Sequence, residues 1–281
     1  MSGDNSDDFG SLQTLHRLWE FFRGQAMRLE NVQSLIKKRQ DPIWLTILPL
    51  LYSVTDTNKS ILLLAREGKL RDTYILSRTA YETILNACFI ITEGEEAADR
   101  AYKHALQKSW RDLDRELIIN DTAVYIRHNN PANPSQNPQL QDAIDEFTTK
   151  RGYEVTSWTP ESLKARIAKI GAKYGQEVVT GLQFGMLAIY RHASDISHGT
   201  LFGAMFAVGL TQPTGLPESP AELVHYQRSH LCMLLTMLGG VIDSLLRILG
   251  QELGETEFVK QSQEAVTALL KEPWVERENA S

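Results

Sequence analysis

The most apolar long stretch of the chain runs from Leu231 to Leu249, and it limits the fold more than any other feature. The stretch is long enough to cross a bilayer, but it contains Asp243, Arg247 and the pair Gly239-Gly240. Charged side chains at the centre of a membrane carry a large free-energy cost. We therefore expect a buried amphipathic helix here, and no membrane span.

Helical periodicity dominates the remainder of the chain. Apolar residues recur at the three- and four-residue spacing of a helix face, and pairs such as Asp41-Pro42 and Ser219-Pro220 mark helix starts. Signals typical of β-strands are nearly absent. The pattern predicts an all-α protein, a bundle of about eight helices in two layers without a significant sheet. The expected helices cover approximately residues 12–38, 43–66, 70–92, 93–120, 138–150, 160–173, 176–198, 219–251 and 256–271.

The chain shows no internal repeat and no strong domain boundary. Residues 1–10 are acidic and polar, so we expect a disordered tail, then a single helical domain over 11–272 and a frayed tail over 273–281. The segment 129–138 has three prolines, four asparagines and no apolar period, which predicts a loop. A division into two helical lobes at that loop stays open. Residues 200–218 contain Gly and Pro and are expected to form a connection.

The composition restricts the classes of partner. A formal net charge of −6 and an isoelectric point near 5.7 argue against a broad DNA- or RNA-binding surface, although they allow a local arginine-lined site. Cys88 and Cys232 lie among apolar residues, which favours buried free thiols in a reducing compartment. The N-terminus resembles neither a signal peptide nor a transit peptide. We expect a cytoplasmic protein that does not bind membranes.

Polar and titratable residues crowd into the segment from Ala188 to Gly199. At about 100° per residue, Arg191 and His198 share one face of a helix. Arginine can hold a phosphate through two hydrogen bonds, and histidine can take a proton from an attacking 2′-hydroxyl or give one to the leaving oxygen. The pair is therefore a minimal set for phosphodiester cleavage. Additional hydrogen bonds are available from Tyr190, Ser194 and Ser197.

The same residues have a structural alternative. Arg191 is four residues before Asp195 and can pair with it, as oppositely charged side chains at this spacing do on helices. His198 lies near the helix C-terminus, where a cation is stabilised by the helix dipole. On this alternative the segment carries no chemistry.

A second polar pair, Arg78 and Glu82, lies in an otherwise apolar helix. Charges in such surroundings are usually paired, and a spacing of four residues allows the two to pair with each other. Glu82 is also the natural partner for Arg191 or His198 if the two helices pack together. A purely structural buried ion pair is the alternative.

One spacing is compatible with a metal site. Glu222 and His225 have the Glu-x-x-His spacing of carboxylate-bridged di-iron bundles, but a second such motif is missing from the sequence. No zinc-type cysteine spacing, phosphate loop or dinucleotide-binding turn is found. We therefore expect no metal and no cofactor.

Over roughly residues 55–200, the chain resembles a bacterial helical family of unknown function. The family has an Arg-x-x-x-Glu element, a later Trp, and a Tyr-Arg-x-x-Ser-x-x-Ser-His-Gly segment. The corresponding residues here are Arg78, Glu82, Trp158, Tyr190, Arg191, Ser194, Ser197, His198 and Gly199.

The spacing of Arg191 and His198, with six residues between them, also resembles the signature of the HEPN superfamily. Members are all-helical, usually dimeric domains, and many are metal-independent ribonucleases of toxin–antitoxin, phage-defence and RNA-guided systems. The resemblance implies catalytic roles for Arg191 and His198, a homodimer, and an RNA substrate. A non-catalytic module that binds a protein or small ligand, with the same residues as a buried polar network, is the alternative.

Overall fold

A computed structural model describes residues 9–112, 114–120, 122–127, 133–211 and 216–271. Residues 1–8 of the predicted tail over 1–10, residues 129–132 of the predicted loop over 129–138, and the predicted frayed tail over 273–281 lie outside the described residues, while the rest of that loop contains a 3₁₀ turn and the start of a helix. Phe9 packs against the core, and the Ser11 hydroxyl caps the first helix by accepting a hydrogen bond from the Thr14 backbone N–H.

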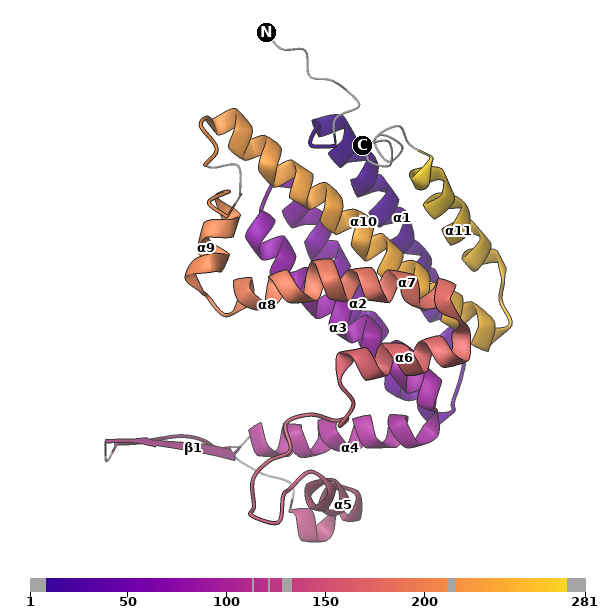
Figure 1. Cartoon of the computed structure of the whole chain (residues 1–281). Helices are drawn as coiled ribbons and strands as arrows, with labels where there is room; N and C mark the ends of the chain where they lie inside the picture. The colour runs from indigo at the N-terminus through magenta and orange to yellow at the C-terminus, as the bar shows by residue number, and fades with distance from the viewer. Residues whose placement is uncertain (1–8, 113, 121, 128–132, 212–215, 272–281) are drawn as a thin grey trace.

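Most of the described residues are helical, as the sequence predicts (Figure 1). The described helices are more numerous than the eight expected. They are α1 (Leu12–Ile36), α2 (Pro42–Arg66), α3 (Leu70–Glu93), α4 (Glu95–Asp112), α5 (Pro138–Glu146), α6 (Leu163–Tyr174), α7 (Gln176–Phe184), α8 (Arg191–Ser197), α9 (Leu201–Ala207), α10 (Pro220–Leu253) and α11 (Glu257–Leu270), with a 3₁₀ turn at Pro134–Gln136 and a π-helical turn at Gly185–Tyr190.

The helix expected over residues 93–120 is wrong in its second half. Helix α4 ends at Asp112, and an antiparallel hairpin follows, with β1 at Asp114–Ile119 and β2 at Thr122–Arg127. Strand β2 is rich in β-branched and aromatic residues, β1 ends in two isoleucines, and Asn120 supplies the left-handed conformation of the turn, with φ of 47°. The connection expected over 200–218 is also more ordered than predicted, because it contains α9.

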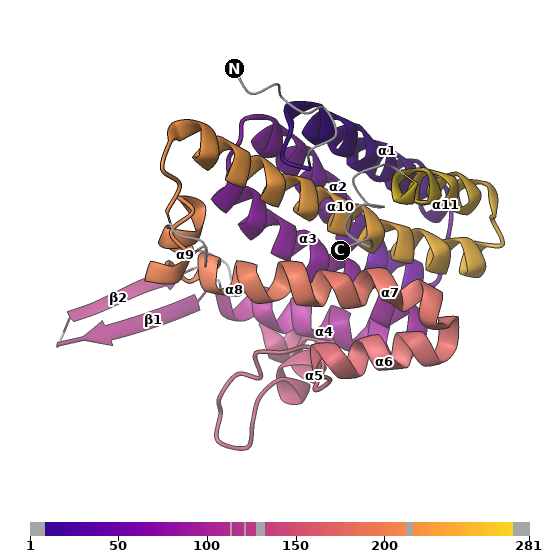
Figure 2. The same cartoon turned by 45° about the horizontal axis from the view of Figure 1, so that its top comes forward.

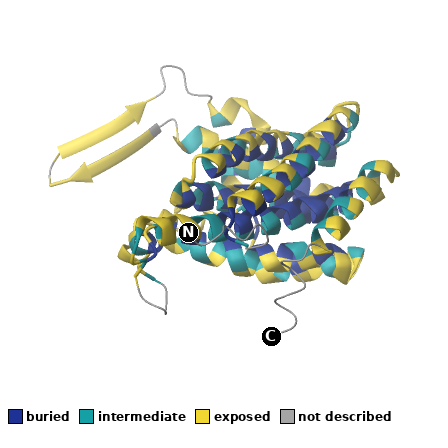
Figure 3. Cartoon of the chain, turned by 90° about the horizontal axis from the view of Figure 1, so that it is seen from above, coloured by how far each residue is buried: buried dark blue, intermediate teal, exposed yellow. Residues whose placement is uncertain are grey.

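The helices form three layers instead of the expected two (Figures 1 and 2). Helices α3 and α10 lie in the middle and pack against each other. Helices α1 and α2 cover one side of this pair, while α6, α7 and α8 cover the other. The buried residues follow this arrangement and concentrate along α3 and α10 (Figure 3).

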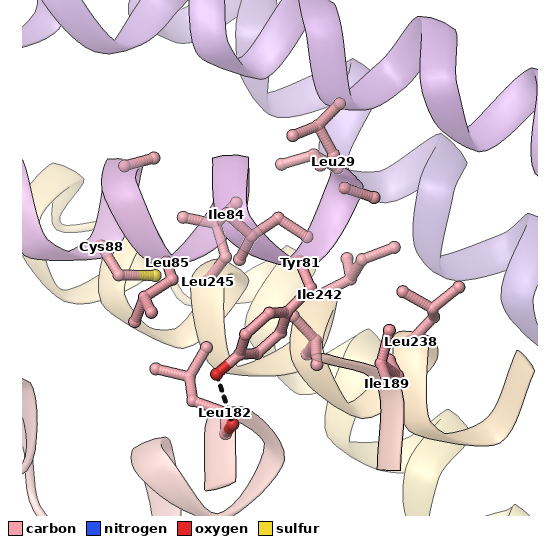
Figure 4. Packing of buried hydrophobic residues seen from close by; sticks show 14 of the residues in the cluster. Leu29, Tyr81, Ile84, Leu85, Cys88, Leu182, Ile189, Leu238, Ile242 and Leu245 are labelled. Carbon is pink, nitrogen blue, oxygen red and sulfur yellow. Dashed lines mark hydrogen bonds between the residues drawn. The ribbon is translucent and has the colours of Figure 1, made fainter. Parts of the chain in front are cut away.

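Tyr81 of α3 lies at the centre of the core and links two layers (Figure 4). Its ring is fully buried, and its hydroxyl donates a hydrogen bond to the carbonyl oxygen of Leu182 in α7 at 3.0 Å. Burial of the phenol raises its pKa, so the hydroxyl keeps the proton that it donates. Cys88, about two helical turns further along α3, and Cys232 of α10 are both buried free thiols, as predicted.

Helix α10 contains the long apolar stretch from Leu231 to Leu249. Within the described part of the chain it is the one helix long and apolar enough to cross a membrane, and 72% of its most apolar window is buried inside the bundle. Its charges have partners: Arg247 donates to Asp243 at 2.7 Å, and the other Asp243 oxygen accepts from the Ser262 hydroxyl at 2.6 Å. These pairs explain how α10 carries charge through the core.

Candidate functional site

Helices α7 and α8 are joined through the π-helical turn at Gly185–Tyr190. Gly185 is pressed against the Tyr81 ring and Val241, and any larger side chain would overlap both. This close approach fixes the π turn against the middle layer. Wide helical turns of this kind occur frequently at functional sites. The turn delivers the Tyr-Arg-x-x-Ser-x-x-Ser-His segment onto α8 at the end of the bundle.

One side of α8 faces α3 through a polar network. Arg78 donates a hydrogen bond from Nε to Glu82 Oε1 at 3.0 Å and another from Nη1 to Ser197 Oγ at 3.2 Å. Its guanidinium also lies 4.8 Å from the centre of the Tyr190 ring, in a cation–π contact. The predicted contact between the Arg78–Glu82 helix and the Tyr190–His198 segment is therefore present. We call Arg78, Glu82, Tyr190 and Ser197 the inner network.

The detailed pairing differs from the expectation. Glu82 pairs with Arg78 and with neither Arg191 nor His198. Ser194 takes part only through its backbone, because its carbonyl oxygen accepts from the Ser197 hydroxyl at 3.0 Å. Glu82 and Arg78 stay paired at i and i+4 because both project from the same face of α3.

A second arginine, Arg166 of α6, extends the inner network along α3. It donates from Nη1 to Asn86 Oδ1 at 2.5 Å, while its buried Nε has no hydrogen-bond partner among the described residues. Burial lowers the pKa of Arg166, and the nearby Tyr81 and Glu82 partly offset that effect. Neither Arg166 nor Asn86 was predicted as a site residue. Nothing in the spacing of two segments 80 positions apart indicates that they meet.

Arg191 and His198 project away from the inner network. Both side chains are exposed, and neither makes a hydrogen bond or an ion pair with the described part of the chain. Arg191 is not paired with Asp195 or with another carboxylate among the described residues, whereas the other half of the structural alternative, His198 at the helix C-terminus, is present. His198 forms the C-cap of α8, and Gly199 ends the helix with a φ of 64°, as its position predicted.

Arg191 lines an open cavity of about 470 Å³ on the outer side of α8. His192 and Asp195 contribute the other polar side chains of the lining. Apolar side chains of α9 and α10, Phe202 and Met233, close its far wall. Neither His192 nor Asp195 is among the predicted site residues, and both line the cavity together with Arg191.

Two histidines, His192 and His230, both contact Phe206 next to this cavity. The ring of His192 stacks on Phe206, with centroids 6.2 Å apart, and the edge of Phe206 contacts His230 at 5.1 Å. Burial lowers the pKa of His230, the carbonyl oxygen of Tyr226 partly offsets this, and the proximity of His192 lowers it further. This half-buried His230 is therefore neutral at neutral pH, and its Nδ1 lies 3.0 Å from that carbonyl oxygen.

The remaining residues singled out in the sequence have structural contacts. The Trp158 carbonyl oxygen accepts from Arg100 Nε at 2.7 Å, and its ring packs against Phe89. Glu222 accepts a hydrogen bond from the Glu218 N–H at 2.7 Å and therefore helps to cap α10. Among the described residues, no group of three or more His, Cys, Asp or Glu side chains is arranged to hold a metal ion.

Comparison with known proteins gives one match. No curated protein and no solved structure matches the chain. The model of a family of unknown function, DUF5677, matches residues 45–212. This range contains the inner network, Arg191, His198 and most of the cavity beside Arg191. The match covers more than half of the chain, which therefore belongs to the family of unknown function DUF5677.

Proposed function

We propose that this chain is a metal-independent ribonuclease, similar to those of the HEPN superfamily, in which Arg191 and His198 act on an RNA phosphodiester. The observation that carries the proposal is the contrast between the two sides of α8. Tyr190 and Ser197 are engaged by Arg78, whereas Arg191 and His198 are exposed and bind nothing in the described chain. An arginine and a histidine held on a fixed helix and free to bind a ligand suit phosphate chemistry.

The inner network supplies the positioning that such chemistry requires. A catalytic group must be held within a fraction of an ångström of its productive geometry by residues that do not themselves react. Arg78 ties α8 to α3 through Ser197 and Tyr190. Gly185 presses the preceding turn against Tyr81. In this proposal these contacts are a scaffold, and only Arg191 and His198 touch the substrate.

The proposed reaction is an attack of the RNA 2′-hydroxyl on its neighbouring phosphorus. The new oxygen–phosphorus bond closes a 2′,3′-cyclic phosphate, and the bond to the 5′-oxygen of the next nucleotide breaks. One His198 takes the proton of the hydroxyl, and a second His198, from another copy of the chain, gives one to the departing 5′-oxygen. Arg191 hydrogen-bonds the phosphate oxygens and stabilises the charge of the transition state.

A homodimer would bring the two histidines together. Two large apolar side chains in the cavity lining are exposed, Leu187 at 61% and Phe202 at 40%. The neighbouring Leu201 is 77% exposed. Apolar side chains exposed beside a site often mark a contact surface. The cavity beside Arg191, at about 470 Å³, lies in the size range of small-ligand sites and would receive a nucleotide next to the scissile phosphate. In this setting the protein would act in the cytoplasm as a toxin or phage-defence effector.

The test is RNA cleavage in excess EDTA. We expect the wild-type protein to cut RNA, to leave cyclic phosphate ends, and to spare DNA of the same sequence. Arg191→Ala should lower the rate at least 100-fold, because one transition-state hydrogen-bond donor contributes that much. Arg151→Ala is the matched control, since Arg151 is exposed and forms no described ion pair. Cleavage that requires a divalent metal, or that Arg191→Ala leaves unchanged, contradicts the proposal.

The second candidate is a non-catalytic module that binds a protein or a small ligand. The inner network favours it, because Glu82, Tyr190 and Ser197 all contact Arg78 and join α3 to the Tyr190–His198 segment. On this alternative the purified protein cuts no RNA, and the variants Arg191→Ala and His198→Ala behave like the wild type. Binding of a mononucleotide without cleavage would favour this candidate.

A further inference from the structure

The hairpin formed by β1 and β2 stands away from the bundle (Figures 1 and 3). It continues from the end of α4, and its principal contact with the rest of the chain is made by β1 with α4. Each side chain described in the two strands is exposed. An isolated two-stranded hairpin is at best marginally stable in water and normally needs further strands or a packed face. We therefore expect another surface to pack against the hairpin and stabilise it.

The register of the strands defines one apolar side. Leu117 stands opposite Val124, and side chains alternate along each strand, so Ile119 and Ile126 share the face of this pair. We call Leu117, Ile119, Val124 and Ile126 the apolar hairpin face. Each of the four is between 58% and 63% exposed. This face has the composition of a sheet face that packs in a core.

The other side of the hairpin is more polar, although it also carries Ile118, and Arg115 lies on the apolar side, opposite Ile126. Glu116 pairs in register with Tyr125, and the guanidinium of Arg127 lies 4.6 Å from the centre of the Tyr125 ring. At the base, Arg115 forms ion pairs with Asp112 and with Glu154. The hairpin is therefore amphipathic and anchored at one end, and its apolar face is the part without a partner in the described chain.

We infer that the apolar hairpin face packs against a second copy of this chain, so that the hairpin is a dimerisation arm. The hairpin projects from the side of the bundle on which α8 and α9 lie (Figures 1 and 2). That side also exposes Leu201 and Phe202. A copy that faces α8 and α9 is therefore within reach of the arm. The inference takes its partner from the homodimer of the proposed function, but it does not depend on ribonuclease chemistry.

The buried area agrees with a second copy as the occupant. At roughly 110 Å² for each exposed side chain, two apolar hairpin faces in contact remove about 900 Å² from water, and stable interfaces bury about 1,200–2,000 Å² in total. The exposed side chains of α9 add the remainder. None of the four members is charged, and Arg115, which lies on the same side opposite Ile126, is paired with Asp112 and Glu154, so two identical faces meet without an unpaired like charge.

The distribution of polar residues disfavours a membrane as the occupant. The polar Asn120 is at the turn of the hairpin, while Arg115, Glu116 and Arg127 are near its base. An inserting hairpin would carry its apolar residues at the tip, whereas here they lie between two polar ends. Lateral contact with another protein surface fits this arrangement.

The experiment measures mass in solution by sedimentation equilibrium, with the full chain at 1–100 µM as the working range. We expect the wild type to be a dimer. Leu117→Glu with Val124→Glu places two charges on the apolar hairpin face and should raise the dimer dissociation constant at least 100-fold. Ile118→Glu is the matched control, because Ile118 is equally exposed on the opposite side of β1, and it should stay dimeric.

A second variant keeps the hairpin intact. Val124→Thr with Ile126→Thr preserves β-branched side chains and should weaken the dimer about tenfold while the circular dichroism spectrum stays unchanged. A monomeric wild type overturns the inference, and so does a wild type that floats with lipid vesicles as a monomer. A dimer that tolerates both double variants but is lost in Phe202→Glu also overturns it and leaves the proposed function intact. If the wild-type dimer cuts no RNA and the hairpin variants are monomeric, the result supports the dimerisation arm and contradicts the proposed function.

Discussion

Arg78 and Ser197 are 119 positions apart in the chain, and a hydrogen bond of 3.2 Å from Arg78 Nη1 to Ser197 Oγ joins α3 to the end of α8. This bond holds the C-terminal end of α8 against α3, although Ser197 itself is exposed. It places Ser197 and Tyr190 against Arg78 and leaves Arg191 and His198 exposed on the rest of the helix. In this account Ser197 and Tyr190 stabilise the segment, whereas Arg191 and His198 carry the proposed chemistry. Substitutions can therefore change stability and activity separately.

The coupling between Arg78 and Ser197 is open to measurement by a double-mutant cycle. We expect Arg78→Ala and Ser197→Ala each to destabilise the protein, with a coupling free energy of about 0.5 kcal/mol, because a solvent-exposed hydrogen bond from a charged donor is lost in either variant. The free energy of unfolding in urea gives the value. The pair Ser60→Ala and Arg78→Ala serves as control, since Ser60 bonds only within α2, and should show additive effects. Additivity for Arg78 and Ser197 as well would mean that the hydrogen bond does not form in solution.

Asn86 accepts a hydrogen bond from Arg166, and without this side chain the half-buried guanidinium of Arg166 loses a hydrogen-bond partner. We expect Asn86→Ala to cost about 2 kcal/mol in the wild type. In a background with Arg166→Met the same change should cost less than half as much, because no buried charge is then left unpaired. Thermal unfolding of the four proteins provides the comparison. An equal cost in both backgrounds would assign the effect to packing of Asn86 alone.

The contact between α7 and α10 depends on two glycines, and only one of them is sterically required. A Cβ on Gly181 would overlap the backbone carbonyl of Gly240 and the Ser244 hydroxyl, whereas a Cβ on Gly240 would meet its nearest neighbour, Gly181 Cα, at 3.9 Å. We expect Gly181→Ala to destabilise the protein by about 2 kcal/mol. Gly240→Ala should be neutral or stabilising by up to about 1 kcal/mol, since alanine favours helix. Melting temperatures that fall equally in both variants would contradict this geometry.

Glu154 predicts how stability changes with pH. The hydrogen bond from Lys108 is the main cause that holds the pKa of Glu154 below its ordinary value, and Arg115 and Arg111 act in the same direction, while burial opposes them. A carboxylate with a lowered pKa in the folded state stabilises the protein fully above its unfolded pKa of about 4.3, and this contribution is lost as the pH falls through the folded pKa.

The matching variant is Glu154→Gln. We expect it to lose about 1 kcal/mol of unfolding free energy at pH 7, and the difference from the wild type should disappear as the pH drops below 4. Urea unfolding at a series of pH values gives the two curves. Glu255→Gln, at an exposed residue between α10 and α11, is the control and should show no pH-dependent difference. Parallel curves for Glu154→Gln at all pH values would contradict the assigned pairing.

The fold was largely predictable because apolar spacing and capping residues are local. Ser219 and Pro220 start α10 as expected, and the charges of α10 are paired in the core. The hairpin was missed because β1 continues a stretch whose charges and apolar residues are compatible with a longer α4. Only the tertiary setting, in which no helix covers residues 114–127, distinguishes the two.

The candidate site was predictable in part. The contact of the Arg78 helix with the Tyr190–His198 segment follows from polar residues in otherwise apolar helices, which must find one another. The orientation of that contact does not follow, because it depends on the π turn at Gly185–Tyr190 and on the fit of Gly185 against Tyr81. The contact of Arg166 with α3 could not be predicted, because the packing of α6 against α3 leaves no pattern in the local sequence.

The most direct test of the division between the two sides of α8 is the rate of RNA cleavage in EDTA, measured for His198→Ala and Ser197→Ala at a temperature where both are folded. We expect His198→Ala to lose activity at least 100-fold with an unchanged melting temperature, because its exposed side chain supports no other residue. Ser197→Ala should melt earlier and retain most of its activity, and His16→Ala, at an exposed histidine of α1, should match the wild type. Equal cleavage rates for His198→Ala and the wild type would contradict the proposed role of His198.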